Sequence, residues 1–188
     1  MEVSLDSIMG KLRKIPYFPS IQTKTKYLVV DVSLTVIGTA FEEVSKSVTE
    51  LKSEIYDWND GRRAAIGVLP KGPYITLEKR GDQIHYLGKG LKSPDVTFFF
   101  KNLDSAFLVF TAQMSAHQAA SECRVLVDGN NAYAMELNRA LSIVETYLFP
   151  SLILNMLFKR PPKLDMDQQI LKGKIGLSLV PALIKKIV

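Results

Sequence analysis

The stretch that decides the fold is residues 93–149, which read SPDVTFFFKNLDSAFLVFTAQMSAHQAASECRVLVDGNNAYAMELNRALSIVETYLF. Five phenylalanines fall within residues 96–110. Before Asn102 apolar side chains recur at every second residue, and after it they recur at every third or fourth residue. This change predicts a strand over 95–101 followed by a helix. Asn102 is a favourable N-cap residue for that helix. The apolar stripe of the predicted helix is Leu103, Phe107, Phe110 and Met114.

The second half of the stretch repeats this order, a strand and then a helix. Residues 125–127 are predicted to form a strand. The DGNN sequence at 128–131 predicts a tight turn, because its residues tolerate positive φ angles. A helix with a broad apolar face is predicted over 132–148.

Three further strands are predicted before the stretch, over residues 62–69, 73–79 and 83–88. Turn sequences that contain glycine separate them, and this arrangement is typical of an antiparallel meander. With the strands at 95–101 and 125–127, the sequence predicts five strands.

A long amphipathic helix is predicted before the meander. From Tyr27 to Trp58, apolar residues recur at steps of three and four without a slip. Residues 27–38 are rich in β-branched side chains and include Gly38, so that part is open to either helix or strand. We expect the helix to lie across a sheet, with Trp58 in the core. A coiled-coil seam between two copies of the chain is the alternative.

The two ends of the chain are predicted to be helical segments outside the sheet-forming middle. Residues 1–20 contain a short amphipathic segment, predicted as a helical arm, that is broken by Pro16 and Pro19. Near the other end, Ile175 to Ile184 carry no charge, which is half the length of a membrane span. The tail is predicted to form a docking, lid or interfacial helix. Its expected apolar face is Leu177, Val180, Ile184 and Ile187.

Composition excludes several classes of protein. The chain has 188 residues, of which 47% are hydrophobic and 23% charged, as in an ordinary globular protein. The net charge is +5, but the basic residues are scattered and lack a nucleic-acid-binding signature. No nucleic-acid partner is therefore expected, and a mild attraction to anionic membranes fits the charge better. A single cysteine, Cys123, indicates a reducing compartment, so we expect a soluble, cytoplasmic protein.

No catalytic motif is present in the sequence. His85 is placed on a strand, His117 in a loop, and Cys123 in a strand as a buried or half-buried structural thiol. None of the three has a partner at motif spacing, and there is no P-loop or dinucleotide fingerprint. We expect no enzyme activity, no cofactor and no metal site. An enzyme site assembled in space from these three residues is the remaining alternative.

The phenylalanine-rich strand and helix have two interpretations. They can form a closed core, where large apolar side chains usually lie. They can also line a cavity for an apolar ligand, because such cavities use the same residue types. Composition alone does not separate these interpretations.

The order of these elements resembles the sterol carrier protein 2 domain family, over roughly residues 41–148. The resemblance lies in DWNDG at 57–61, PDVTFFF at 94–100, the helix sequence at 102–120, and CRVLVDGNN followed by AYAMELNRAL at 123–141. It implies an α/β fold of the α+β kind, in which a curved, mainly antiparallel five-stranded sheet and its helices enclose an apolar tunnel. The chain then divides into a helical extension at 1–40, the domain at 41–148, and an apolar helical extension at 149–188.

The function that the resemblance implies is non-enzymatic binding or transfer of a sterol-like, fatty acyl or phospholipid ligand. Two other partners are expected from the sequence: a membrane surface for the C-terminal helix and a second copy of the chain in a homodimer. The alternative function is an oligomerisation or partner-binding module for a lipid- or quinone-modifying enzyme. The residues expected to line the tunnel or its mouth are Phe98, Phe100, Phe107, Phe110, Met114, Val125, Val127, Leu137, Leu141, Leu148, Phe149 and Leu152.

Overall fold

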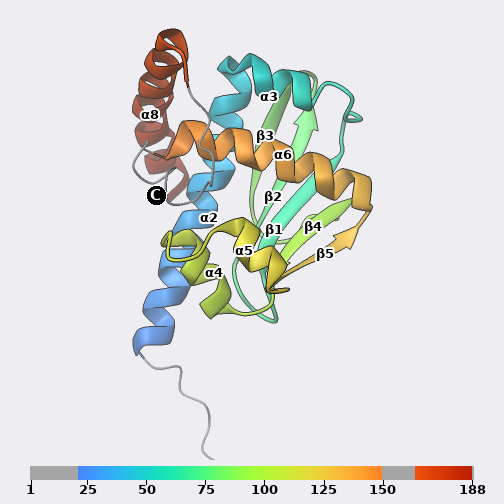
Figure 1. Ribbon diagram of the computed structural model, residues 1–188, viewed down its shortest axis with the longest axis vertical. Helices are drawn as coiled ribbons and strands as arrows, with labels where there is room; N and C mark the ends of the chain where they lie inside the picture. The colour runs from blue at the N-terminus through green and yellow to red at the C-terminus, as the bar shows by residue number, and fades with distance from the viewer. Residues whose placement is uncertain (1–20, 150–163, 188) are drawn as a thin grey trace, which may run out of the picture.

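The computed structural model describes residues 21–149 and 164–187 and shows an α+β fold built on one five-stranded sheet (Figure 1). The predicted arm at 1–20 and the predicted mouth residue Leu152 lie outside the described residues. The five predicted strands are confirmed, each within two residues of its expected ends. The strands are β1 (Arg63–Val68), β2 (Tyr74–Arg80), β3 (Gln83–Lys89), β4 (Val96–Phe100) and β5 (Val125–Gly129).

The sheet is mixed, with the strand order β3-β2-β1-β4-β5. β1, β2 and β3 form the predicted antiparallel meander, and β5 pairs antiparallel with β4. β4 returns beside β1 in parallel, with Ile66 opposite Phe98. The expectation of a mainly antiparallel sheet is therefore confirmed, and its one parallel pair joins the meander to the phenylalanine-rich stretch.

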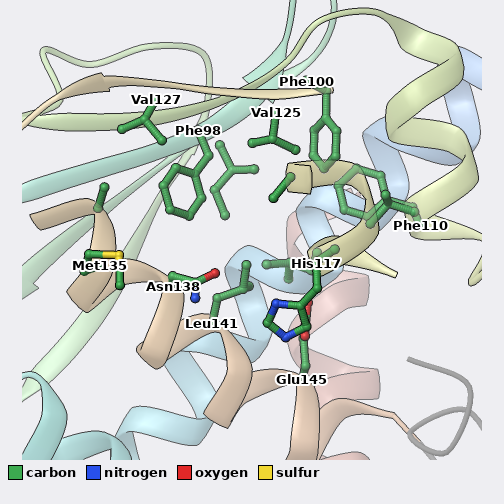
Figure 2. A pocket seen from close by; sticks show the side chains of 16 residues that line it. Phe98, Phe100, Phe110, His117, Val125, Val127, Met135, Asn138, Leu141 and Glu145 are labelled. Carbon is green, nitrogen blue, oxygen red and sulfur yellow. The ribbon is translucent and has the colours of Figure 1, made fainter. Parts of the chain in front are cut away.

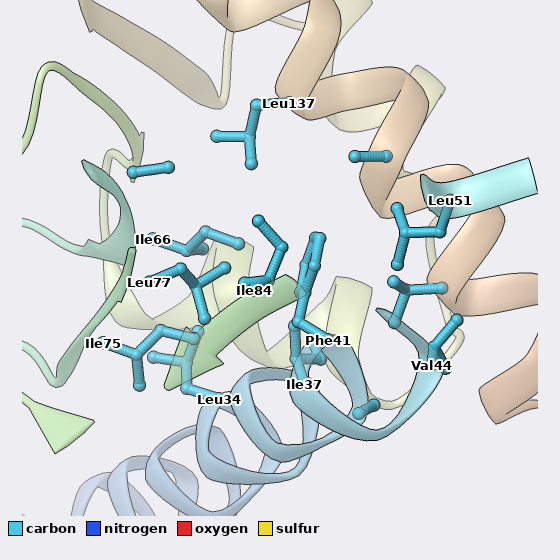
Figure 3. Packing of buried hydrophobic residues seen from close by; sticks show 14 of the residues in the cluster. Leu34, Ile37, Phe41, Val44, Leu51, Ile66, Ile75, Leu77, Ile84 and Leu137 are labelled. Atoms are coloured by element: carbon cyan, nitrogen blue, oxygen red, sulfur yellow. The ribbon is translucent and has the colours of Figure 1, made fainter. Parts of the chain in front are cut away.

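The long amphipathic stripe forms two helices, α2 (Ile21–Ser47) and α3 (Thr49–Glu54), separated at Val48. Residues 27–38 are helical despite their β-branched side chains, because the apolar stripe packs against β2 and β3. Figure 3 shows Leu34, Ile37 and Phe41 of this stripe pointing into the core. From Val30 to Trp58 the stripe is buried within the chain, so it is not available as the seam of a coiled-coil dimer.

Gly38, which made the helix prediction ambiguous, has a packing role. A Cβ atom at this position would lie 2.7 Å from Cδ2 of Tyr86 on β3. The absence of a side chain therefore lets the middle of α2 approach the sheet closely. α2 also runs through residue 40 without interruption, and the division of the chain at residues 40 and 148 stays a prediction.

The phenylalanine-rich helix is shorter than expected. α4 (Leu103–Phe110) begins at Asn102, whose side chain accepts a hydrogen bond from the Ser105 amide, as its N-cap role predicts. It ends where Ala112 takes a φ angle of 57°, so Met114 lies beyond the helix and does not continue its stripe.

Two local predictions near residue 120 are wrong. His117 lies in a short helix, α5 (Ala116–Ser121), and not in a loop, because the Ser115 side chain caps that helix by accepting from the Gln118 amide. Cys123 is exposed in the turn before β5, and not buried in a strand. Its φ angle of 53° places it in the left-handed region that ends α5.

The last two helices pack on the core formed by α2 and the sheet. α6 (Asn131–Leu148) contacts β4, β5 and α2, and α8 (Met166–Ile187) contacts α2 and α6. Figure 1 shows α8 beside α2, with α6 crossing the sheet. Ile175 and Leu179 of α8 are buried, and the Lys172 ammonium donates to the Thr146 carbonyl at 2.7 Å. α8 therefore packs as a docking helix, while its lid role stays a prediction.

Three of the four residues of the predicted apolar face of α8 point outward, and the side chain of the fourth, Ile187, lies outside what the structure describes. Leu177, Val180 and Ile184 are 78%, 58% and 59% exposed, so the helix docks through a different face. Among the helices that the structure describes, none has the length and apolar character needed to cross a membrane.

Candidate apolar ligand site

A cavity of about 300 Å³ lies between the β4–β5 end of the sheet and the helices α4, α5 and α6 (Figure 2). One side chain each from α2 and β1 reaches it. Its described lining residues are Ile37, Ile66, Phe98, Phe100, Val109, Phe110, Ala116, His117, Ala120, Val125, Val127, Ala134, Met135, Asn138, Leu141 and Glu145. The wall is mainly apolar with a few polar groups, which is the character of a small-molecule pocket, and its volume is at the lower end of the usual range.

The two neighbouring strands supply one wall. Strand alternation points Phe98 and Phe100 toward the cavity, while Phe99 faces away and packs edge-on against Tyr74, with the ring centroids 6.0 Å apart. Phe100 also meets Phe110 of α4 edge-on, with a centroid separation of 5.3 Å. Two aromatic rings from different elements therefore pack against each other in the wall of the cavity.

Helix α6 supplies the opposite wall. Its lining residues are Ala134, Met135, Asn138, Leu141 and Glu145, which recur at helical spacing along one face. The Asn130 side chain caps the helix by accepting from the Ala132 amide, which fixes where this face begins.

The polar groups of the cavity are Asn138, His117 and Glu145. Burial raises the pKa of the Glu145 carboxyl to about 7, because the ionised form loses its hydration there. Neither the Asn138 amide nor the Glu145 carboxyl makes a side-chain hydrogen bond or an ion pair with the residues described in the structure. Figure 2 shows Val127 and Met135 toward one end of the cavity and His117 and Glu145 toward the other.

A second, small cavity of about 30 Å³ adjoins the polar end. It shares His117, Asn138 and Glu145 with the larger one and extends to Ser142 and Phe149. The apolar space therefore continues past the polar groups toward the C-terminal end of α6.

Six of the residues predicted to line a tunnel do line the larger cavity: Phe98, Phe100, Phe110, Val125, Val127 and Leu141. Phe149 lines the smaller one. That these residues bind a ligand stays a prediction.

Four other predicted lining residues lie elsewhere. Leu137 is fully buried in the main core, and Leu148 packs against that core. Phe107 faces α2, where its ring centroid is 5.7 Å from the Lys26 ammonium. Met114 lies past the end of α4 and does not line the cavity. Phe107 and Leu137 occupy the same helices as the lining residues but turn to the core side, which apolar character alone does not distinguish.

Sequence reasoning missed the polar members of the site. Asn138 and Glu145 have the spacing of the cavity-facing side of α6, but as polar residues they would be expected to face solvent. Only the structure shows that they share a cavity with residues of α5. Nor does the sequence indicate that Ile37 and Ile66, from two distant elements, reach the same space.

The site does not resemble a metal centre. Within residues 21–149 and 164–187, no three histidine, cysteine, aspartate or glutamate side chains gather closely enough to hold a metal ion. Of the three candidates for an assembled enzyme site, only His117 lines the cavity, while His85 lies on β3 and Cys123 in an exposed turn.

Comparison with known proteins gives fold neighbours only. No protein-family model matches the sequence, and no curated protein matches it. The structural neighbours are sterol carrier protein 2-like domains, the family that the sequence resembles.

Three of these neighbours illustrate the degree of likeness. A UbiJ-SCP2 ubiquinone synthesis protein is 15% identical over 64% of this chain and 99% of its own, with a TM-score of 0.41. Sterol carrier protein domain 2 of Helicoverpa armigera is 21% identical over 61% of this chain and 89% of its own, with a TM-score of 0.42. Palmitated sterol carrier protein 2-like 2 of Aedes aegypti is 12% identical over 56% and 91%, with a TM-score of 0.39. Likeness at this level says nothing about the ligand of this chain.

Proposed function

We propose that this protein binds a lipid-like apolar ligand in the cavity between β4–β5 and α6, without catalysing a reaction. The single observation that supports the proposal is the cavity itself, with its largely apolar lining and its two aromatic rings from β4. The resemblance of the sequence to sterol carrier protein 2 domains, a lipid-binding family, points the same way.

The cavity volume limits the length of the ligand. At about 30 Å³ for each water-sized group, 300 Å³ holds about ten methylene groups. Burying them contributes about 8 kcal/mol at 0.8 kcal/mol per methylene, before the costs of association. A longer chain would extend past Val127 and Met135, both of which are exposed to solvent at the cavity.

We further propose that α8 contacts a membrane surface, from which such a ligand would be exchanged. The supporting observation is its outward apolar stripe of Met166, Ile170, Leu177, Val180 and Ile184, each more than half exposed. The helix also carries four lysines against one acidic residue, Asp167. An apolar stripe on a basic helix is typical of binding in the plane of an anionic membrane.

Native mass spectrometry of the protein from its expression host, with lipid extraction of the same sample, tests ligand binding. We expect one adduct of a few hundred daltons for each chain, released on denaturation. Ala120 lies on the exposed surface of α5 and lines the cavity. Ala120→Trp should therefore abolish the adduct, because the larger side chain would occupy the space of the ligand.

Ala132→Trp is the matched control, since Ala132 is an exposed helical alanine outside the cavity. A wild-type protein that carries no adduct even after incubation with 1-decanol would contradict the proposal. An adduct that persists in Ala120→Trp would place the ligand elsewhere.

A further inference from the structure

The sheet has two edge strands, β3 and β5, and helix α2 protects the first of them. The Ser45 hydroxyl of α2 accepts a hydrogen bond from the Ile84 amide of β3 at 3.0 Å. The Glu42 carboxylate of the same helix accepts from the Tyr86 amide at 3.4 Å. Side chains of α2 therefore satisfy backbone groups of β3 that face away from β2, which is one way in which proteins prevent a sheet edge from pairing with another chain.

The other edge, β5, has no such cover. It is the outermost strand in Figure 1, and no described strand pairs with its free side. Its last four residues are exposed, including Leu126 at 40% and Val127 at 47%. The Lys101 amide donates to the Arg124 carbonyl at 2.9 Å, so by strand alternation Val125 and Val127 point their amide and carbonyl groups away from β4.

The sequence of this edge is complementary to itself, since it reads RVLVD from Arg124 to Asp128. If two copies pair antiparallel about a two-fold axis at Leu126, each Arg124 lies opposite an Asp128. Each Val125 then lies opposite a Val127, and these are the residues whose backbone groups point outward in both copies. An axis at Val127 would also match the backbone groups, but it would put Leu126 opposite Asp128 and leave the charges without cross-strand partners.

Both charged side chains are accessible for this pairing. Val125 and Val127 line the cavity, so Arg124 and Asp128 project from the opposite face of the sheet. The Asp128 carboxylate makes no hydrogen bond or ion pair with any other residue that the structure describes. Arg124 is 38% exposed and pairs at 2.6 Å with Glu122, an equally exposed carboxylate, and such a surface pair contributes little.

We propose that β5 is a self-association surface, through which two copies of this chain join their sheets edge to edge about a two-fold axis at Leu126. Each pair of Val125 with Val127 exchanges two backbone hydrogen bonds, and the two Arg124–Asp128 pairs flank the axis. The paired segments are short, so the dimer is reversible. The proposal does not depend on ligand binding, although the second copy would cover Val127, which is part of the cavity wall.

Reversal of the charges tests the pairing, with sedimentation velocity at about 5–500 µM protein as the measurement. We expect the wild type to form a reversible dimer in this range. Arg124→Asp and Asp128→Arg should each weaken the dimer at least about tenfold, because like charges then lie opposite each other. An equimolar mixture of the two variants should dimerise about as well as the wild type, because each charge again meets its opposite.

Asp57→Arg is the matched control, since it reverses the charge of an exposed residue in a turn before the sheet. Its dimer should be as stable as that of the wild type. A wild type that stays monomeric over the whole range would overturn the proposal. Dimerisation that both single reversals leave unchanged, or that the mixture does not restore, would overturn it as well.

A cross-link tests the position of the axis. Leu126 lies opposite its own copy at a pair without backbone hydrogen bonds, where the Cα atoms are about 4.5 Å apart, a distance that a disulfide can span. In a Cys123→Ser background, Leu126→Cys should therefore form a disulfide-linked dimer under mild oxidation. Leu91→Cys in the same background is the control, because Leu91 is a similarly exposed leucine outside the strands. Equal cross-linking of the two variants would contradict an axis at Leu126.

Discussion

Glu145 is a carboxyl group whose charge the fold disfavours. Its pKa is raised from 4.5 to about 7 by burial in the folded chain. Well below pH 4.5, both states hold the proton and the group has little effect on stability. Between pH 4.5 and 7 the Glu145 carboxyl ionises in the unfolded chain but keeps its proton in the folded one. The free energy of unfolding therefore falls as pH rises. Above pH 7 the loss is complete and amounts to as much as about 3 kcal/mol.

Glu145→Gln should therefore stabilise the protein in a pH-dependent way. We expect a difference of less than about 0.5 kcal/mol in the free energy of unfolding near pH 4.5 and a gain of up to about 3 kcal/mol at pH 8. Urea unfolding at pH 4.5, 6 and 8 measures it, with Asp57→Asn as the control for removing a carboxylate. A difference between Glu145→Gln and wild type that is constant with pH would contradict the burial of the charged form.

Arg62 links the start of the sheet to α6. Its guanidinium carbon lies 3.5 Å from the centroid of the Tyr133 ring and 4.3 Å from that of Trp58, and its side chain is 4% exposed. It also donates to Glu136 at 2.5 Å. This arginine is thus stacked on two rings and paired with a carboxylate, a geometry that the point charge of lysine does not reproduce.

We expect Arg62→Lys to cost about 2 kcal/mol of stability, and Arg62→Ala about 3 kcal/mol, because Glu136 loses its buried partner. Chemical denaturation measures both. Arg63→Lys is the matched control, since that neighbouring side chain is 38% exposed and the change should cost less than about 1 kcal/mol. If Arg62→Lys is as stable as the wild type, the stacking contributes nothing.

At the scale of elements, Gly38 sets how closely α2 packs on β3. Alanine normally favours a helix over glycine by about 1 kcal/mol, but here its Cβ atom would lie within 3 Å of the Tyr86 ring. We expect Gly38→Ala to destabilise the protein by about 1–3 kcal/mol through overpacking.

Gly173→Ala in α8 is the opposite case, because nothing lies within 4 Å of the added atom. That change should stabilise the protein by up to about 1 kcal/mol, and thermal unfolding of both variants compares them. A stabilising Gly38→Ala would show that α2 does not approach the sheet as closely as the structure describes.

The outward stripe of α8 predicts binding to vesicles. Co-sedimentation should be stronger with vesicles that contain phosphatidylserine than with phosphatidylcholine alone, and it should weaken with salt. Leu177→Gln combined with Ile184→Gln should reduce binding at least about tenfold, because two exposed apolar contacts are lost.

Leu91→Gln, which removes an exposed leucine from a loop, should bind as the wild type does. Equal binding by the α8 variant and the wild type would exclude this helix as the contact surface.

Some elements could be predicted from sequence because their signals are local. Strand alternation gave the meander, and Asn102 marked the start of α4. The short helix α5 also has a local signal, Ser115 followed three residues later by Gln118, which is a capping pattern. The end of α5 has no such local signal, because Cys123 takes a left-handed conformation in which glycine or asparagine is usual.

For the whole molecule, the path of the chain decides which side chains share a space. The parallel pairing of β1 with β4 brings Ile66 beside Phe98, and α5 closes over the Glu145 face of α6. Neither event leaves a periodic signal in the sequence. Half of the twelve predicted lining residues do line the larger cavity. Apolar character alone did not separate these six from Leu137 and Phe107, which face the core.

The most direct test of the central claim is methyl NMR of the protein during a titration with 1-decanol. Ile66, Val125 and Leu141 line the cavity, whereas Leu51 and Ile55 lie in the core outside it. Binding in the cavity predicts saturable shifts of the first three methyl groups, with one ligand for each chain, and little change at Leu51 and Ile55. Shifts that are absent at saturation, or confined to Leu177 and Ile184 of α8, would contradict it.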